Sequence, residues 1–390
     1  MMKKILFLSH MYPTNNDKSY GKVVHQQAIS LLGEGNEIKV VSPIPYVPAI
    51  LRGSSKRFND YYSTKNIEVH DRIEVHYPRF LSIKRSPVLF NLSSFFMFAS
   101  VLKRVKIIKK TFDFEVIHAH FGFPDAFVAM KIAELFNIKL ITTYQSTDLD
   151  KTYQSNRKLR GKLTKAFKVS DELISPSPRL TTQLKKVMNL DSHTIGYGID
   201  LEEVSINNDY KSTSKPTMIS VSRLVESKGI NHNIEAISIL HEKGVNIDYI
   251  VVGDGPEKKN LIKLVNKLGI KKYVKFTGAL SHEEAIKQIS SADIFSLPSW
   301  QETFGLVYLE AMANFKPVIG CKGQGFDGII ENGKNGFLAQ PKSTESVCNI
   351  IQHILENQSE MDQLVKRARV TAEDYTFEVI ANKINILYRN

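Results

Sequence analysis

Two glutamates in the segment PSWQETFGLVYLEA, residues 298–311, are spaced so that one ligand could contact both. Glu302 and Glu310 stand eight positions apart. The apolar run before Glu302 ends at Pro298, and apolar residues after it recur at helical spacing, so we expect Glu302 in a turn and Glu310 on a helix. Eight helical residues rise only ~12 Å and return a side chain to nearly the same face. Carboxylates accept hydrogen bonds in pairs, which suits the vicinal hydroxyls of a sugar or a ribose.

The backbone after Glu302 adds a second binding feature. Unpaired N–H groups at a helix N-terminus, here those of residues 303–306, form a site for an anion. An alternative is that Glu302 only caps the helix and Glu310 is a solvated helix residue. The spacing by itself favours that alternative, because capping carboxylates are common.

The longer segment PSWQETFGLVYLEAMANFKPVI, residues 298–319, resembles the E-x7-E motif of the retaining glycosyltransferases of family 4, which have the GT-B fold. In that family the first glutamate contacts the donor sugar and the second binds the ribose of the nucleotide. The resemblance implies these roles for Glu302 and Glu310. It also implies donor contacts from the residues between them, namely Phe304, Gly305 and Leu306.

Arg223 and Lys228 lie in SRLVESKG, just after a predicted strand, and Gly229 opens the next predicted helix. Two cations beside a helix N-terminus could neutralise a diphosphate whose charge grows as a sugar–phosphate bond breaks. The segment is similar to the R-x4-K element of family 4, which binds the donor diphosphate without a metal. The resemblance therefore implies catalytic roles for Arg223, Lys228 and Glu302, and no metal or other cofactor.

Glycine-rich turns are the next candidates for donor binding. GDGPE follows a strand as in the family, although a tight turn capped by Asp254 explains it equally well. In GCKGQGFDGII, backbone N–H groups near two glycines could approach a phosphate or a sugar. Near the N-terminus, relatives usually carry two adjacent glycines where this chain has Tyr20 and Gly21. The glycines expected to bind the donor are Gly21, Gly253, Gly323 and Gly325.

Polar residues after two predicted strands of the first half are candidates for the acceptor side. His118 and His120 are two apart on a strand and share a face; without an evident third ligand we interpret them as core or cleft residues rather than a metal pair. HAHF resembles envelope glycosyltransferases in which the second histidine lies near the cleft. TTYQSTDLD departs from the family pattern His-Gly-x-Asp, because Gln145 cannot take a proton. We expect His120, Gln145 and Asp148 near the acceptor. Residues 148–150 also spell D-x-D, the metal–diphosphate motif of a different glycosyltransferase fold, and we interpret this match as coincidence.

The elements that must position these residues alternate between strand-like and helix-like segments. This alternation predicts an α/β protein with parallel, doubly wound sheets. A polar stretch ending in proline, residues 201–216, predicts a linker. Together with this pattern, the resemblance to family 4 implies a GT-B fold with two Rossmann-like domains facing each other across a cleft, an acceptor-binding domain at 1–200 and a nucleotide-sugar-binding domain at 217–390. The sequence leaves open whether the last helix packs back on the first domain.

Composition limits the classes that remain. The chain has 390 residues, 24% of them charged, and its net charge of +12 comes from residues 1–200, which hold 30 Lys and Arg against 17 Asp and Glu. A helix from about Val88 to Lys110 joins an aromatic run to a basic end. It is either a membrane-surface helix or a core helix with a solvated tail. No signal peptide is visible, a membrane-spanning helix is disfavoured, and two cysteines fit a reducing cytoplasm.

The resemblance to family 4 implies a hexosyltransferase, and it alone implies that the reaction retains the configuration of the sugar. Its donor would be a nucleotide sugar, with uridine diphosphate (UDP) the expected carrier, and its acceptor a lipid-linked or oligosaccharide glycan of the bacterial cell surface. We expect a cytoplasmic protein, with peripheral contact to an anionic inner membrane face left open. Nucleic acid is disfavoured, because aromatic and basic residues are not interleaved as in stacking proteins. A GT-B nucleotide-sugar epimerase and a non-catalytic nucleotide-sugar binder remain as alternatives.

Overall fold

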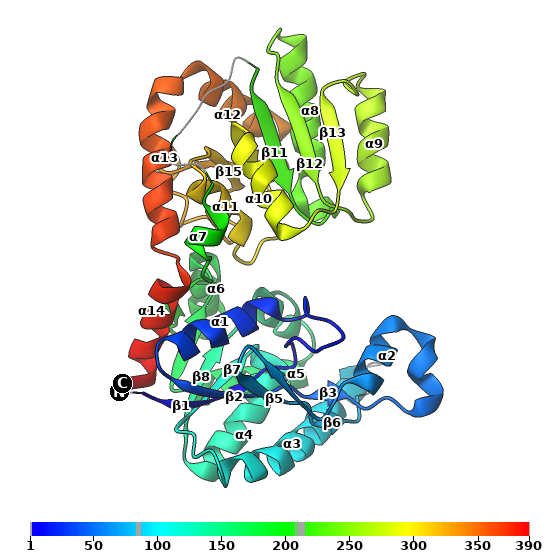
Figure 1. Ribbon diagram of the computed structural model, residues 1–390, viewed down its shortest axis with the longest axis vertical. Coiled ribbons are helices and arrows are strands. Elements are labelled where there is room, and N and C mark those ends of the chain that lie inside the picture. The colour runs from blue at the N-terminus through cyan, green and yellow to red at the C-terminus, as the bar shows by residue number, and fades with distance from the viewer. Residues whose placement is uncertain (1, 83–86, 207–208, 210–214, 390) are drawn as a thin grey trace. The chain divides into compact units, whose positions relative to one another are not determined.

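The computed structural model describes residues 2–82, 87–206, 209 and 215–389. The chain divides into two compact units (Figure 1). Unit 1 comprises Met1–Pro176, Leu180–Tyr197 and Phe377–Asn390, and unit 2 comprises Ser177–Arg179 and Gly198–Thr376. Both units are α/β, as the alternation of the sequence predicts.

Unit 1 is built on an eight-stranded sheet in the order β10-β9-β8-β7-β1-β2-β5-β4. Every pairing is parallel except that of β4 with β5. The central strands β1, β7 and β8 are buried at nearly every position because helices cover both faces of the sheet. Two short strands, β3 and β6, form a separate parallel pair. The strands are β1 (Lys4–Leu8), β2 (Glu37–Val41), β3 (Ile44–Pro45), β4 (Ile67–His70), β5 (Ile73–His76), β6 (Arg79–Phe80), β7 (Val116–His120), β8 (Lys139–Thr143), β9 (Glu172–Ser175) and β10 (His193–Thr194).

Helices lie on both faces of this sheet, with α1 and α14 packed together on one face and α3 and α4 on the other (Figure 1). One stripe of α3 is core: Met97, Val101, Val105 and Ile108 are buried at helical spacing. The opposite face exposes Phe95 and the basic end of the helix. The helix therefore has a core stripe and a solvated basic end, and its contact with a membrane surface stays a prediction. The helices are α1 (Lys22–Gly33), η1 (Ala49–Ser54), α2 (Lys56–Ser63), α3 (Pro87–Lys109), η2 (Gly122–Ala126), α4 (Phe127–Phe136), η3 (Asp148–Thr152), α5 (Arg157–Val169), α6 (Pro178–Met188) and α14 (Phe377–Arg389).

Unit 2 is built on a six-stranded parallel sheet in the order β13-β12-β11-β14-β15-β16. Helix α8 packs with α9 and α12, and α11 packs with α10 and α13. The strands are β11 (Thr217–Val221), β12 (Asp248–Val252), β13 (Val274–Gly278), β14 (Ile294–Ser296), β15 (Val318–Cys321) and β16 (Phe337–Ala339). The helices are α7 (Leu201–Val204), η4 (Glu226–Lys228), α8 (Ile230–Glu242), α9 (Lys258–Lys267), α10 (His282–Ser291), α11 (Leu306–Ala313), α12 (Thr344–Glu356) and α13 (Gln358–Glu373).

The topology of each sheet marks where a ligand would bind. In unit 1, β1 lies between β2 and β7, and in unit 2, β11 lies between β12 and β14. The chain therefore turns outward in both directions from β1 and from β11. In open parallel sheets, ligands bind beyond the carboxyl ends of the strands at such a switch point.

The boundary between the units differs from the expected linker at 201–216. Residues 201–206 belong to unit 2, because Val204 is buried and its carbonyl accepts from Asn314 Nδ2 at 2.6 Å. A polar composition does not reveal this packing, since the backbone carbonyl supplies the contact. Residues 207–208 and 210–214 of the expected linker lie outside the described residues. The last helix, α14, is part of unit 1 and packs on α1.

Candidate active site

Lys228 and Glu302 form an ion pair in unit 2. Lys228 Nζ donates to Glu302 Oε2 at 2.6 Å, and the two side chains are 19% and 15% exposed. Glu302 Oε1 also accepts from the backbone N–H of Thr303 at 3.2 Å. The structure thus brings together two residues that lie 74 positions apart in the chain and that the sequence predicts for catalysis.

The loops that carry this pair are joined through their backbones. Lys228 ends a short 3-10 turn, and Gly229 begins α8 with a φ of +72°. A Cβ on Gly229 would lie 2.6 Å from the carbonyl oxygen of Pro298, so only glycine lets the two loops approach. Trp300 N–H donates to the carbonyl of Ser227 at 2.9 Å. The ion pair is therefore fixed by main-chain contacts on both sides.

A second joint holds the loop around Glu302 against the loop that follows β15. Gly325 N–H donates to the carbonyl of Glu302 at 3.1 Å. A Cβ on Gly325 would lie 2.3 Å from the carbonyl oxygen of Thr303. Gly305, with a φ of +97°, begins α11 directly after this joint. Gly305 and Gly325 thus bring backbone close to Glu302, and their contact with a donor stays a prediction.

The other two glycines of unit 2 that the sequence predicts for donor binding, Gly253 and Gly323, lie in different loops. Gly253 has a φ of +133°, and a Cβ there would lie 1.8 Å from the carbonyl oxygen of Ser222, so the turn after β12 packs on the residue before Arg223. Arg223 itself is exposed, and no ion pair to it occurs within the described part of the chain. Gly323 donates its N–H to Asp327 at 2.6 Å and has open space beside it.

Glu310 lies on α11, as expected, and has a partner that the sequence does not predict. His282 Nε2 bonds to Glu310 Oε1 at 2.9 Å, and His282 Nδ1 lies 3.2 Å from Glu203 Oε1. The hydrogen bond to Glu310 raises the pKa of His282 above its usual value, opposed by burial and aided by both carboxylates. Glu310 is 13% exposed. The only sequence signal for His282 is its position at the start of a capped helix.

Two further donor-site predictions concern the start of α11. Phe304 is 2% exposed and packs against the rings of Phe326 and Tyr375, both at 5.6 Å. Leu306 is half-buried at the first position of the helix. Phe304 can therefore offer a ligand its backbone but not its ring.

These loops share one edge of the unit 2 sheet. They follow the carboxyl ends of β11, β12, β14 and β15, with β11 at the topological switch point. The edge carries two cations, two carboxylates and the starts of two helices. Cations and helix N-termini suit a diphosphate, while the carboxylates suit hydroxyl groups.

In unit 1, the residues predicted for the acceptor are held in structural contacts. Asp148 is 1% exposed and accepts from three backbone N–H groups, those of Gly122 at 2.8 Å, Phe123 at 3.1 Å and Gln145 at 2.9 Å. Burial raises the pKa of Asp148 to about 6 although these bonds lower it. The Gln145 side chain bonds to Tyr197. The acceptor roles of Gln145 and Asp148 stay predictions.

The two histidines of β7 are fully buried and stack on each other at 4.4 Å. His118 bonds to Tyr388 at 2.6 Å and to Thr143 at 2.8 Å, while both ring nitrogens of His120 are unpaired among the described residues. Burial lowers the pKa of His120 to about 3, so it is neutral. His120 does not line the pocket described next, and its expected place near the acceptor stays a prediction.

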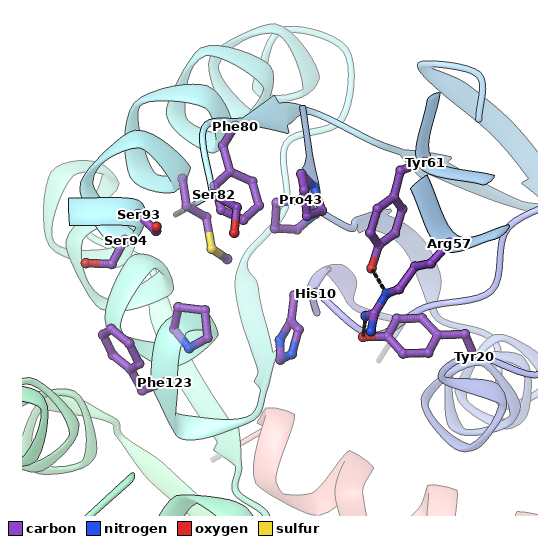
Figure 2. Close-up of a pocket in the computed structure, with 13 residues that line it drawn as sticks. His10, Tyr20, Pro43, Arg57, Tyr61, Phe80, Ser82, Ser93, Ser94 and Phe123 are labelled. Carbon is purple, nitrogen blue, oxygen red and sulfur yellow. Dashed lines mark hydrogen bonds between the residues drawn. The ribbon is translucent and has the colours of Figure 1, made fainter. Parts of the chain in front are cut away.

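A pocket in unit 1 lies at the carboxyl ends of β1, β2 and β7 and has a cavity volume of about 160 Å³ (Figure 2). His10, Pro43 and Phe123 line it from the loops after these strands. His10 Nδ1 lies 2.7 Å from Asp125 Oδ2, and Asp125 is fully buried. Gly21 lies in the β1–α1 loop, where a Cβ would meet the backbone of Met11 at 2.4 Å.

The described part of the chain offers neither a membrane span nor a metal cluster. No helix in it is long and apolar enough to cross a membrane. No group of three or more His, Cys, Asp or Glu residues in it could hold a metal ion.

The chain is similar to known glycosyltransferases over most of its length. It is 25% identical to the α-monoglucosyldiacylglycerol synthase of Acholeplasma laidlawii, over 91% of this chain and 89% of that protein. It is also 25% identical to a putative teichuronic acid biosynthesis glycosyltransferase, TuaC, of Bacillus subtilis, over 89% and 88%. The solved structure of Anabaena HepE in complex with UDP matches with a TM-score of 0.72 and 18% identity, covering 99% of each chain.

Two family models match adjacent parts of the chain. The model described as glycosyltransferase family 4 matches residues 21–203, and the model described as glycosyl transferases group 1 matches residues 203–371. The family, the fold class and the enzyme class expected from the sequence are thus confirmed. The chain belongs to the glycosyltransferases of the family 4 and group 1 type, which have the GT-B fold.

Proposed function

We propose that the protein transfers a hexose, with retention, from a UDP-sugar to a lipid-linked or oligosaccharide acceptor during synthesis of the bacterial cell surface. The observation that carries the donor half of this proposal is the Lys228–Glu302 pair, held by main-chain joints at the starts of α8 and α11. The structural neighbour bound to UDP supports the choice of nucleotide. The names of the Acholeplasma and Bacillus relatives support a glycolipid or an envelope polysaccharide as product.

In the proposed reaction the site acts mainly through electrostatics. Arg223 and Lys228 stabilise the charge that develops on the departing diphosphate, and the N–H groups at the helix starts add to this effect. Glu302 orients the donor sugar, and Glu310 accepts hydrogen bonds from the ribose hydroxyls. The acceptor hydroxyl attacks on the same face as the leaving phosphate, which takes its proton. Removal of one such stabilising group typically lowers kcat by ~10²–10³.

We extend the proposal to the cofactor and to location. Two cations beside the diphosphate can neutralise it without a metal ion, so we expect activity to persist in EDTA. The exposed face of α3 and the basic first half of the chain support peripheral contact with an anionic membrane from the cytoplasmic side.

Thermal shift with UDP, GDP and ADP, with EDTA and then with magnesium, tests the donor site. A ligand at a hundred times its Kd stabilises a protein by ~2.7 kcal/mol. We expect UDP to raise the Tm of the wild type in EDTA. The Tm of Glu310→Ala should not rise with UDP. Absence of a shift with every nucleotide would contradict the donor site and favour a different donor.

Turnover then separates a transferase from an epimerase. Arg223→Ala and Lys228→Ala should each lower kcat by ~10² or more. Turnover within a few-fold of wild type in both variants would refute the proposed roles. If the protein converts the donor to its epimer without any acceptor, the transferase proposal is wrong and the protein is a GT-B epimerase.

A further inference from the structure

The pocket of unit 1 has a charged wall that the proposed donor chemistry does not use. Arg57 of α2 donates from Nε to the hydroxyl of Tyr61 at 2.9 Å and from an η nitrogen to that of Tyr20 at 3.2 Å. Its guanidinium also lies 5.3 Å from the centre of each ring. Figure 2 shows these three side chains together at one side of the pocket.

The charge of Arg57 is held in place but not cancelled. Both of its bonding partners are phenols, and burial raises the pKa of Tyr20 to about 12, which keeps that group neutral. No carboxylate forms an ion pair with Arg57 among the residues that the structure describes. Arg57 also lines an adjoining pocket with Asp17, Asp60 and Lys56, and neither of these carboxylates is within ion-pair distance of it. A guanidinium preorganised in this way suits an oxyanion such as a phosphate.

The rest of the pocket is lined mostly by apolar side chains, together with His10 and three serines, Ser82, Ser93 and Ser94. Phe80, Met97 and Phe123 line it together with prolines from the strand ends. His10 is 30% exposed, and Asp125 occupies its Nδ1, which leaves Nε2 for a bound molecule. A carboxylate accepts through both oxygens, so Asp125 favours the tautomer with hydrogen on Nδ1 and a lone pair on Nε2. Nε2 can then accept a hydrogen bond from a hydroxyl.

We infer that this pocket binds the acceptor of the proposed reaction and that the acceptor is an anionic amphiphile, with a phosphate on Arg57, an apolar part along Phe80 and Phe123, and a hydroxyl on His10. That the bound molecule is the acceptor rests on the proposed function. That it is an anionic amphiphile rests on the residues of the pocket alone. Its position at the switch point of the unit 1 sheet is where such sheets bind ligands.

Calorimetric titration of the full chain with three probes tests this inference. Octyl phosphate carries both features, octyl glucoside only the alkyl chain, and glucose 1-phosphate only the phosphate. We expect octyl phosphate to bind at least tenfold more tightly than either other probe. Equal binding of octyl glucoside would refute the role of the charge, and equal binding of glucose 1-phosphate would refute the amphiphile.

Two arginine variants make the comparison specific. Arg57→Gln should weaken octyl phosphate at least tenfold and leave octyl glucoside unchanged, since a charge-assisted bond is lost. Arg52→Gln is the matched control, because Arg52 lies on the neighbouring η1 over the ring of Tyr62 and outside the pocket. Unchanged octyl phosphate affinity in Arg57→Gln would overturn the inference.

The His10 contact and the link to catalysis have separate readouts. A glycerol phosphate with one octyl chain adds a hydroxyl to octyl phosphate, and His10→Phe should remove the extra affinity that this hydroxyl gives; an unchanged difference would refute the contact. UDP stabilisation is recorded on the same samples. If UDP stabilises them while octyl phosphate fails to bind, the pocket inference fails and the donor site stands.

Discussion

Breaking the ion pair between Lys228 and Glu302 should affect UDP affinity and kcat differently. Glu302 neutralises the cation that the proposed mechanism directs at the diphosphate. Glu302→Gln keeps the shape of the side chain and frees the charge of Lys228. We expect it to bind UDP at least as tightly as the wild type, while kcat falls ~10²-fold because the sugar is no longer oriented. Calorimetry and UDP release measure the two quantities, and weaker UDP binding with unchanged kcat would contradict the assignment.

His282 makes the stability of unit 2 depend on pH. The bond to Glu310 raises its pKa in the folded protein, so folding favours the protonated histidine. This stabilisation is fully present below the unfolded pKa of 6.5 and is lost as the pH rises through the raised value. The Tm of His282→Gln should therefore fall below that of the wild type at pH 6, and the gap should shrink by pH 9. A gap that does not change with pH would refute the role of the charge.

At the scale of elements, α8 offers two glycines that separate backbone strain from contact. Gly229 at its start and Gly244 after its end have φ values of +72° and +82°, but an added methyl group would meet backbone within 3 Å only at Gly229, against Pro298. Gly244→Ala should cost about 1–2 kcal/mol from φ alone. Gly229→Ala should cost more, and it should lower UDP affinity by moving Lys228. Chemical denaturation and calorimetry check this, and equal costs with unchanged UDP binding would contradict it.

The positions of the helices and strands could largely be predicted from the sequence. The tertiary contacts of individual side chains could not. The helix expected at about 88–110 spans Pro87–Lys109, and the strand expected to carry His118 and His120 spans Val116–His120, because apolar periodicity is local. Asp148 differs: three N–H groups from two loops converge on it, and no spacing in the sequence indicates that convergence. The same holds for His282 with Glu310, and for Arg57 with Tyr20. Motifs located the loops that carry Lys228 and Glu302, whereas tertiary contacts decide which partner each side chain has.

At the scale of the whole molecule, the excess positive charge lies in residues 1–200, and part of it is on the exposed face of α3. Lys103 and Lys106 are exposed there, and the same helix also exposes Ile107 at 51% and Phe95 at 60%. If this face meets an anionic membrane, each basic residue contributes about 1 kcal/mol, and salt weakens the binding. The double variant Lys103→Glu with Lys106→Glu should thus bind phosphatidylglycerol vesicles much more weakly than the wild type in sedimentation.

The matched control changes the same net charge on unit 2. Lys259 and Lys263 are exposed one turn apart on α9, so Lys259→Glu with Lys263→Glu alters the total charge equally without touching α3. This control should retain vesicle binding if a defined face of unit 1 makes the contact. Equal loss in both double variants would show that net charge alone governs the attraction. Retained binding in both would show that α3 does not meet the membrane.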